Sequence, residues 1–248
     1  MNSLIINADD FGLTKAVTEG IFDSIRNGVV SRTSAMMCSE SSTLIKSYSS
    51  ELKGKIGLHL QLTDGKPVLH PNQIPSLVVS NGRFPEKSNQ LKRIHFKEIE
   101  LEWNAQMNAL LDFGIKPSHI DTHHNVHRFP KAFKAICAIG QKYEIPVRPL
   151  SINMAKKLDS LNLLQNIICL ESWPAEEVTE SSLVNFLVNT FNNCGRIKKP
   201  IELMCHPGYV DSELKIRSNY LEKRERELEV FTNPELPDLL RNNNIRLL

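Results

Sequence analysis

The chain has 248 residues, of which 41% are hydrophobic and 23% are charged, a composition typical of a globular protein and unlike that of a disordered one. Since α/β barrels of this length commonly form a single domain, we expect one domain over residues 1–248, with residues 63–95 as a long loop excursion. The 30 basic residues are nearly balanced by 28 acidic residues, so no overall positive charge favours a nucleic-acid partner.

The cysteine pattern and the first residues indicate a cytoplasmic protein. Five cysteines are scattered along the chain without a CxxC pair, which is typical of reduced thiols. The start, MNSLIINADDFG, lacks the basic residues and the apolar run of a signal peptide. No stretch approaches the roughly 20 apolar residues that span a bilayer, so we expect no membrane partner.

The first part of the chain alternates between predicted strands and predicted helices. Apolar runs predict strands at Leu4–Ala8, Thr33–Cys38 and Ile56–Leu62, and helical periodicity predicts helices at Lys15–Asn27 and Thr43–Leu52. This alternation argues for parallel strands that are joined by crossover helices.

The stretch Thr63–His95 interrupts the alternation. It holds four prolines and few apolar runs, as expected for a long loop outside the sheet. Helical periodicity returns at Phe96–Phe113, and we interpret the glutamates on the polar face of this helix as solvent-exposed.

The second half of the chain continues in the same way. The patterns predict a helix at Lys131–Lys142, strands at Val147–Ile152, Asn166–Leu170 and Pro200–Met204, a helix at Ser181–Asn193, and a final helix and strand at Leu236–Arg241 and Ile245–Leu248. The segment Lys215–Val230 is dense in alternating charge, which predicts a solvent-facing helix or a loop that leads into one.

The segment HIDTHHNVHRFP, residues 119–130, contains four of the eight histidines. Flanking prolines disfavour a helix, so we predict a short strand that passes into a loop. Alternate side chains of a strand share a face, and His119, Asp121 and His123 would therefore point the same way. Buried His and Asp need hydrogen bonds, paired charges or a bound ion. A satisfied polar network without a metal is the alternative to a metal site.

Further polar residues follow the ends of other predicted strands: Asp9 and Asp10 after the first, His59 in the third and His206 after a late one. Ligands of parallel α/β folds bind at these strand ends, so we expect the residues to converge with the histidine-rich segment. One carboxylate oxygen and two imidazoles leave positions of a metal open for water and substrate. At a turning strand end, one aspartate can bind the metal while its neighbour acts as a base, and a histidine can protonate the leaving group.

Four segments resemble the signature blocks of one enzyme family: NADDFG at 7–12, GLHLQLT at 57–63, KPSHIDTHHNVHRFP at 116–130 and ELMCHPG at 202–208. They are similar to the carbohydrate deacetylases of the YdjC family, which includes the chitooligosaccharide deacetylase. The resemblance implies an α/β fold, a distorted (β/α) barrel with mostly parallel strands that is related to polysaccharide deacetylases. It also implies hydrolysis of N-acetyl groups on amino sugars, and it suggests a homodimer.

The resemblance further implies roles for individual residues. Asp10, His59 and His123 would bind the metal, Asp9 would act as the general base, and His206 would act as the general acid. The family is usually assigned Mg²⁺, whereas two imidazoles suit Zn²⁺ or another transition metal at least as well. The expected cofactor is therefore one divalent ion, Mg²⁺ by resemblance.

Other residues are candidates for supporting roles. Asp121 is expected to orient a ligand imidazole. Arg148 is expected either to hold a carboxylate or acetate oxygen or to form a structural ion pair. His127, like the other histidines of its segment, is expected to shape the loop or to contact substrate. Asn125 stands where the family block HxDxHHHVH has a further histidine, a departure that leaves the implied metal ligands intact.

The sequence supports one main hypothesis and two alternatives. The main hypothesis is a metal-dependent hydrolase that removes acetyl groups from an N-acetylated carbohydrate. A metal-dependent phosphoesterase is the second, although such enzymes usually bind more than one metal and need more ligands. A sugar-binding protein that retains the metal site without turnover is the third. Asp9 and His206 argue against it, because binding alone needs neither a base nor an acid.

Overall fold

The computed structural model describes residues 2–91, 93–165, 167–170, 173, 177–193 and 199–248. The chain divides into two compact units: unit 1 comprises residues 1–9, 14–33 and 166–248, and unit 2 comprises residues 10–13 and 34–165. The strands β1 (Asn2–Phe11) and β2 (Arg32–Ala35) contribute residues to both units.

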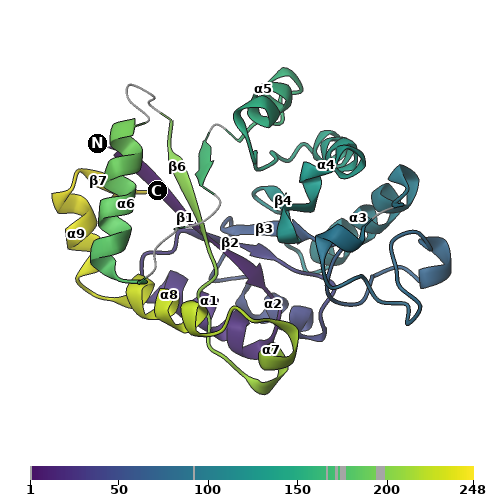
Figure 1. Cartoon of the computed structure of the whole chain (residues 1–248), viewed down its shortest axis with the longest axis horizontal. Coiled ribbons are helices and arrows are strands. Elements are labelled where there is room, and N and C mark those ends of the chain that lie inside the picture. Colours follow the sequence, from purple (N-terminus) through teal and green to yellow (C-terminus); the bar gives the residue numbers. More distant parts are fainter. Residues whose placement is uncertain (1, 92, 166, 171–172, 174–176, 194–198) are drawn as a thin grey trace. The chain divides into compact units, whose positions relative to one another are not determined.

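Unit 1 is built on parallel strands. β1 pairs in parallel with β6 (Ile201–Cys205) and with β7 (Ile245–Leu247), and β5 (Ile168–Leu170) pairs in parallel with β6. The beginning of β1 and β7 therefore lie side by side (Figure 1). Most apolar side chains of β1 and β6 are buried, as expected for parallel strands that are covered on both faces.

The helices of unit 1 are α1 (Lys15–Arg26), α6 (Glu180–Asn193), α7 (Ser212–Arg217), α8 (Glu222–Thr232) and α9 (Leu236–Asn242). The first begins at Lys15 because the Thr14 hydroxyl accepts a hydrogen bond from the Val17 N–H at 3.2 Å. Val17, Ile21 and Ile25 form its buried stripe. α1 packs against α8 (Figure 1).

Unit 2 contains β3 (Ile56–Leu60) and β4 (Ile120–Thr122), which pair in parallel, and β3 neighbours β2. Its helices are α2 (Ile45–Tyr48), α3 (Phe96–Leu111), α4 (Pro130–Tyr143) and α5 (Ile152–Ser160), with 3-10 turns at Glu40–Leu44, Pro71–Gln73, Ser88–Gln90 and His123–Arg128. α3 and α4 pack side by side (Figure 1). The predicted parallel α/β architecture is therefore confirmed.

Some of the predicted element positions are wrong. The predicted strand Val147–Ile152 is reduced to parallel bridges of Val147 with Ile120 and Leu164. Ile152 instead begins α5, because the Ser151 hydroxyl caps this helix by accepting a hydrogen bond from the Met154 N–H at 3.1 Å. The predicted helix over residues 43–52 is only a 3-10 turn followed by the one-turn helix α2. The first residue of the predicted strand at 166–170 lies outside the described residues.

Two helices bury charged residues that we predicted to be solvent-exposed. Glu102 of α3 is 0% exposed, and Arg224 and Glu227 of α8 are 3% and 6% exposed. The Glu102 carboxylate accepts hydrogen bonds from the backbone N–H groups of Val68 and Leu69. Buried carboxylates need such partners, and these partners come from distant segments that a helical charge pattern does not reveal.

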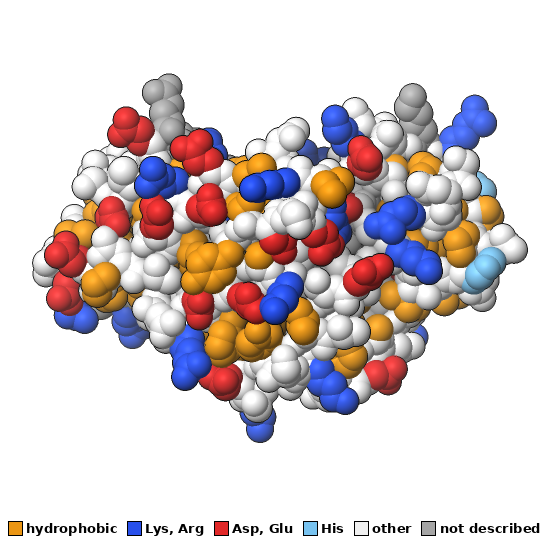
Figure 2. Space-filling model, turned by 90° about the horizontal axis from the view of Figure 1, so that it is seen from below, with side chains coloured by type: hydrophobic (Ala, Val, Ile, Leu, Met, Phe, Trp, Pro, Cys, Tyr) orange, Lys and Arg blue, Asp and Glu red, His pale blue; other side chains and the backbone are white. Residues whose placement is uncertain are grey.

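The surface shows mixed charge. On the face drawn in Figure 2, basic and acidic side chains both occur, with hydrophobic side chains between them. In the described part of the chain, no helix combines the length and the apolar character needed to cross a bilayer.

Candidate metal centre

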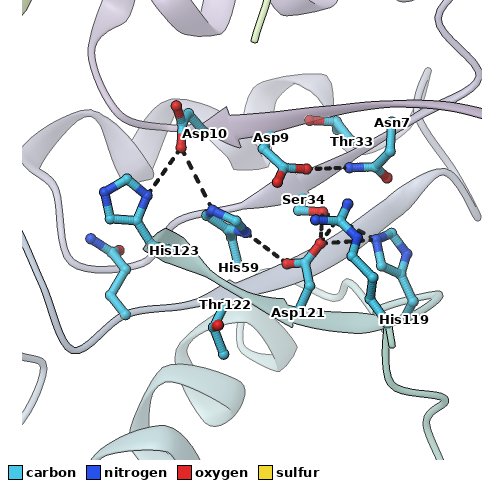
Figure 3. Close-up of polar contacts among 12 residues, drawn as sticks. Asn7, Asp9, Asp10, Thr33, Ser34, His59, His119, Asp121, Thr122 and His123 are labelled. Carbon is cyan, nitrogen blue, oxygen red and sulfur yellow. Dashed lines mark hydrogen bonds and ion pairs between the residues drawn. The ribbon is translucent and has the colours of Figure 1, made fainter. Parts of the chain in front are cut away.

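Strand β1 changes direction at its aspartate pair. Asp10 has a φ of +74°, in the left-handed region that Asp adopts more readily than most residues. The Oδ1 atom of Asp9 accepts a hydrogen bond from Asn7 Nδ2 at 2.7 Å, two residues back along the strand. Asp10 instead points toward two histidines, His59 and His123 (Figure 3). The two aspartates therefore have different partners.

Three side chains of unit 2 bring possible ligand atoms together. Asp10 Oδ1 lies 3.2 Å from His123 Nδ1 and 3.6 Å from His59 Nε2. One ligand atom from each of the three residues lies within 4.8 Å of the other two. All three side chains are buried. The structure thus brings together residues that are more than 100 positions apart in the sequence.

This arrangement fits a divalent cation. Bonds of about 2.0–2.2 Å to a cation place neighbouring ligand atoms about 3–3.5 Å apart. The separations of 3.2 and 3.6 Å from Asp10 Oδ1 are close to this range. Three protein ligands also leave further coordination positions available for small molecules.

Asp121 fixes the orientation of His59. The pairing of β3 with β4 places these two residues opposite one another. Asp121 Oδ1 lies 2.7 Å from His59 Nδ1, and the other ring nitrogen therefore faces Asp10 (Figure 3). A carboxylate that binds the remote nitrogen of a ligand histidine is a recurrent feature of metal sites, because it sets the ring orientation and raises the basicity of the ligand nitrogen.

A charged network keeps Asp121 ionised. Its Oδ2 atom accepts a hydrogen bond from Ser34 Oγ at 2.7 Å and lies 2.8 Å from an Arg148 guanidinium nitrogen. Burial raises the pKa of Asp121, but the charges of Arg148 and His59 outweigh burial and hold this pKa well below its usual value. For Arg148, the structure thus shows an ion pair with Asp121.

His119, which directly precedes β4, also belongs to this network. Its ring nitrogens lie 3.0 Å from Ser118 Oγ and 3.1 Å from Ser34 Oγ. The ring covers Gly57, where an added Cβ would lie 2.3–2.6 Å from the ring atoms. Any side chain at Gly57 would therefore displace His119. An isolated glycine in a predicted strand is a sequence signal for such a close approach.

The loop after β4 is joined to the loop after β3. His124 and Asn125 both have positive φ, 54° and 51°. His124 Nδ1 lies 3.0 Å from Thr63 Oγ1, and its ring lies 3.9 Å from the His123 ring, measured between centroids. Burial lowers the pKa of His124 to about 4, so its ring is neutral at pH 7.

His127 shapes this loop. Its Nδ1 atom lies 2.6 Å from Thr122 Oγ1 and its Nε2 atom lies 3.1 Å from the Arg148 carbonyl oxygen. The side chain is fully buried, and burial lowers its pKa to about 4. Both ring nitrogens are therefore engaged within the protein, as the loop-shaping alternative requires.

The other two candidate catalytic residues belong to unit 1. Asp9 is buried and bonds to Asn7 as described above. His206 follows β6 and is half-buried. Its backbone N–H donates a hydrogen bond to Glu227 Oε2 at 2.5 Å, and its ring lies edge-on to the Tyr220 ring with 5.6 Å between centroids.

Sequence reasoning missed several supporting residues. Ser34 lies in a predicted strand with no pattern that marks it, and Thr63 is the last residue of the block at 57–63, which assigns it no role of its own. Glu102 did carry a signal, because it lies three positions after Ile99 and next to Trp103, on the apolar face of α3. A charged residue on such a face is buried and must have a partner.

Comparisons with known proteins agree with this picture. Residues 3–242 match the family model described as YdjC-like protein. A carbohydrate deacetylase from Clostridium beijerinckii is 32% identical, over 99% of this chain and 97% of the relative. A chitooligosaccharide deacetylase from Proteus mirabilis is 32% identical, over 98% of this chain and 96% of the relative.

Solved structures show the same fold. A protein from Enterococcus faecalis V583, described with a proposed role in cellobiose-phosphate cleavage, is 31% identical with a TM-score of 0.87, over 100% of this chain and 97% of that chain. The Xyl-CE4 domain of a xylanase from a Trinervitermes trinervoides hindgut metagenome is 7% identical with a TM-score of 0.50, over 100% of this chain and 86% of that chain. The predicted α/β fold of the distorted (β/α) barrel type is confirmed. The chain belongs to the YdjC-like family.

Proposed function

We propose that this protein is a metal-dependent carbohydrate deacetylase that hydrolyses N-acetyl groups of amino sugars of the chito-oligosaccharide type. The carbohydrate deacetylases among its relatives support this proposal. The observation that carries it is the buried cluster of Asp10, His59 and His123, whose ligand atoms lie within 4.8 Å of one another. The protein would act on a small carbohydrate in the cytoplasm, as the scattered cysteines indicate, and the family resemblance suggests a homodimer.

The proposed roles divide between a cation and the side chains. Asp10, His59 and His123 would hold one divalent cation, which supplies polarisation of a carbonyl and a lowered pKa of water. We propose Mg²⁺ from the resemblance, with Zn²⁺ or another transition metal as the alternative that two imidazoles favour. Asp121, through His59 Nδ1, would keep the ring in its binding orientation.

Asp9 and His206 would move the protons. Asp9 takes a proton from the attacking water, which bonds to the acetyl carbon. The C–N bond then breaks, and His206 gives a proton to the leaving amine. The products are acetate and a free amino sugar. The hydrogen bond from Asn7 supports this role for Asp9, because it fixes the position of one carboxylate oxygen.

The test is acetate release from N-acetylglucosamine oligomers. We expect release that stops in EDTA and returns when one divalent metal is added. The same samples should be assayed for phosphate release from a phosphorylated disaccharide, since one solved relative has a described role in cellobiose-phosphate cleavage. Phosphate release without acetate release would establish a phosphoesterase instead. Binding of metal and sugar with neither product would establish a binding protein.

The role of Asp9 has a separate test. Asp9→Asn should retain the bound metal and lose turnover, because an amide cannot take a proton from water. Asp238→Asn is a matched control, since Asp238 is exposed and pairs only with Arg241 on the same helix among the ion pairs described. Full activity in Asp9→Asn would remove Asp9 from the mechanism.

A further inference from the structure

The loop that carries His206 is held at several points within unit 1. The His206 N–H donates to Glu227 Oε2 at 2.5 Å, and the Gly208 N–H donates to the Arg224 carbonyl oxygen at 3.2 Å. The Tyr209 hydroxyl donates to Asp23 Oδ2 at 2.9 Å. The loop is therefore bonded to α8 on one side and to α1 on the other.

This loop packs closely against α1 and α8 at two glycines. A Cβ added to Gly20 of α1 would lie 2.6 Å from both Gly208 Cα and Tyr209 N. A Cβ added to Gly208 would lie 3.1 Å from the Arg224 side chain and 3.2 Å from Val17 Cα. These distances are shorter than ordinary van der Waals contacts. Two glycines thus allow α1, the loop and α8 to pack directly on one another.

Glu227 is the residue of α8 that bonds directly to His206. Its side chain is buried, and its two oxygens accept hydrogen bonds from the His206 N–H and from the Tyr220 hydroxyl. Burial, followed by the charge of Glu227, raises the pKa of Tyr220 far above its usual value. Tyr220 therefore stays protonated and keeps donating to Glu227.

The two hydrogen-bond donors to the Glu227 carboxylate are both connected with His206. One is the backbone N–H of His206, and the other is Tyr220, whose ring lies edge-on to the His206 imidazole at 5.6 Å and 64°. The Arg224 guanidinium also contacts the Tyr220 ring, with its central carbon 5.8 Å from the ring centroid. The Glu227 carboxylate thus bonds to the backbone of His206 and to the tyrosine whose ring contacts the His206 imidazole.

We infer that Glu227 and Tyr220 are positioning residues that hold the His206 imidazole in place for proton transfer. This inference rests on the proposed function, in which His206 protonates the leaving amine. A general acid must lie within hydrogen-bond reach of the leaving atom, and a misplacement of about 1 Å can cost about 100-fold in rate. Substrate binding does not require the His206 imidazole to be placed this way. Misplacement of the imidazole should therefore lower kcat and leave KM nearly unchanged.

The kinetic test compares removal with conservative replacement in the metal-loaded enzyme. Glu227→Ala and Tyr220→Leu should each lower kcat by about 10–100-fold and leave KM within about twofold. Glu227→Gln should restore kcat to within about threefold of wild type, because its amide oxygen still accepts the His206 N–H and its amide nitrogen can donate to Tyr220. Tyr220→Phe keeps the ring but loses the hydrogen bond to Glu227, so its kcat should lie between those of wild type and Tyr220→Leu. Glu229→Gln is the matched control, since Glu229 is exposed on the same helix and pairs with Arg226.

A second measurement reads the position of His206 without turnover. In protein labelled with ¹³C-histidine, the His206 ring signal is identified by its loss in His206→Gln. We expect one narrow signal in wild type and Glu227→Gln, and a shifted or broadened signal in Glu227→Ala and Tyr220→Leu. If Glu227→Ala does not fold, as melting curves would show, Tyr220→Leu decides the result.

The outcomes separate the inference from the proposed function. An unchanged His206 signal in Tyr220→Leu and Glu227→Ala would overturn the inference. The inference would also be overturned if the loss of kcat in the double variant Glu227→Ala/His206→Gln equalled the product of the two single losses, because the two residues would then act independently. If the signals change as expected while wild-type protein releases no acetate, the proposed function fails and the positioning of His206 by Glu227 and Tyr220 stands.

Discussion

Buried carboxylates at strand ends and buried carboxylates on helices have different partners. The strand-end carboxylates, Asp10 and Asp121, face imidazole nitrogens at 2.7–3.6 Å. The helix-borne carboxylates, Glu102 and Glu227, accept hydrogen bonds from backbone N–H groups of loops. The first kind assembles ligands that a cation can use. The second kind uses its oxygens to hold the loops that follow the strands.

Glu102 shows what the second kind does. It accepts from the Val68 N–H at 2.9 Å and from the Leu69 N–H at 3.0 Å, near the start of the long loop after β3. Gln106, one turn along α3, donates to Glu102 and also to the Gln61 carbonyl oxygen. This loop begins next to Thr63, which bonds to His124. Helix α3 therefore anchors a loop that starts beside the cluster.

The largest expected effect comes from the strand-end network. Asp121→Asn should lower metal affinity about 10–100-fold, because His59 Nδ1 loses its charged partner. It should also lower the free energy of unfolding by about 3–5 kcal/mol, since the buried Arg148 loses the carboxylate that lies 2.8 Å from its guanidinium. Calorimetric metal titration and urea unfolding measure the two effects, with Asp238→Asn as the control. Unchanged metal affinity would show that Asp121 does not support the cluster.

The helix-borne carboxylate should affect stability more than metal binding. Glu102→Ala leaves two backbone N–H groups without their acceptor, which should cost about 1–3 kcal/mol of unfolding free energy. Glu225→Ala is the control, because Glu225 is exposed on α8. Metal affinity of Glu102→Ala should equal that of wild type. A loss of affinity as large as that of Asp121→Asn would remove the distinction between the two kinds of carboxylate.

The third effect, which is the smallest when taken per pH unit, is a change in the pH dependence of stability. The pKa of His127 is lowered from 6.5 to about 4 by burial, so between these pH values the unfolded chain binds a proton that folded His127 does not. The free energy of unfolding should therefore fall as pH falls through this window, by at most about 1.4 kcal/mol per pH unit for one proton. His127→Gln should make this slope shallower, and exposed His95→Gln should not. Equal slopes in wild type and His127→Gln would contradict the burial account.

Asp121 behaves differently in the same experiment. Its pKa is held well below the usual value, so its contribution is complete above about pH 4 and is lost only as pH falls further. Unfolding between pH 6.5 and 4.5 therefore reports on His127 and His124, whose pKa values are lowered to about 4, and not on the strand-end carboxylate Asp121.

The sequence indicated the histidines and aspartates at strand ends better than the residues that support them, for a physical reason. His59 and Asp121 lie in short apolar runs whose parallel pairing follows from the alternation of elements. Ser34 and Glu227 acquire their roles from partners 87 and 21 residues away. No local pattern encodes such partners. The strand predicted at residues 147–152 failed because local apolar content did not reveal the Ser151 cap that starts α5.

The central claim is that Asp10, His59 and His123 bind one divalent cation, and calorimetric titration of the metal-free protein tests it directly. The account predicts binding of one ion per chain in wild type, with no measurable binding in His59→Ala or His123→Ala and unchanged binding in His95→Ala, whose side chain is exposed. Equal binding of the cation by wild type, His59→Ala and His123→Ala would contradict the claim.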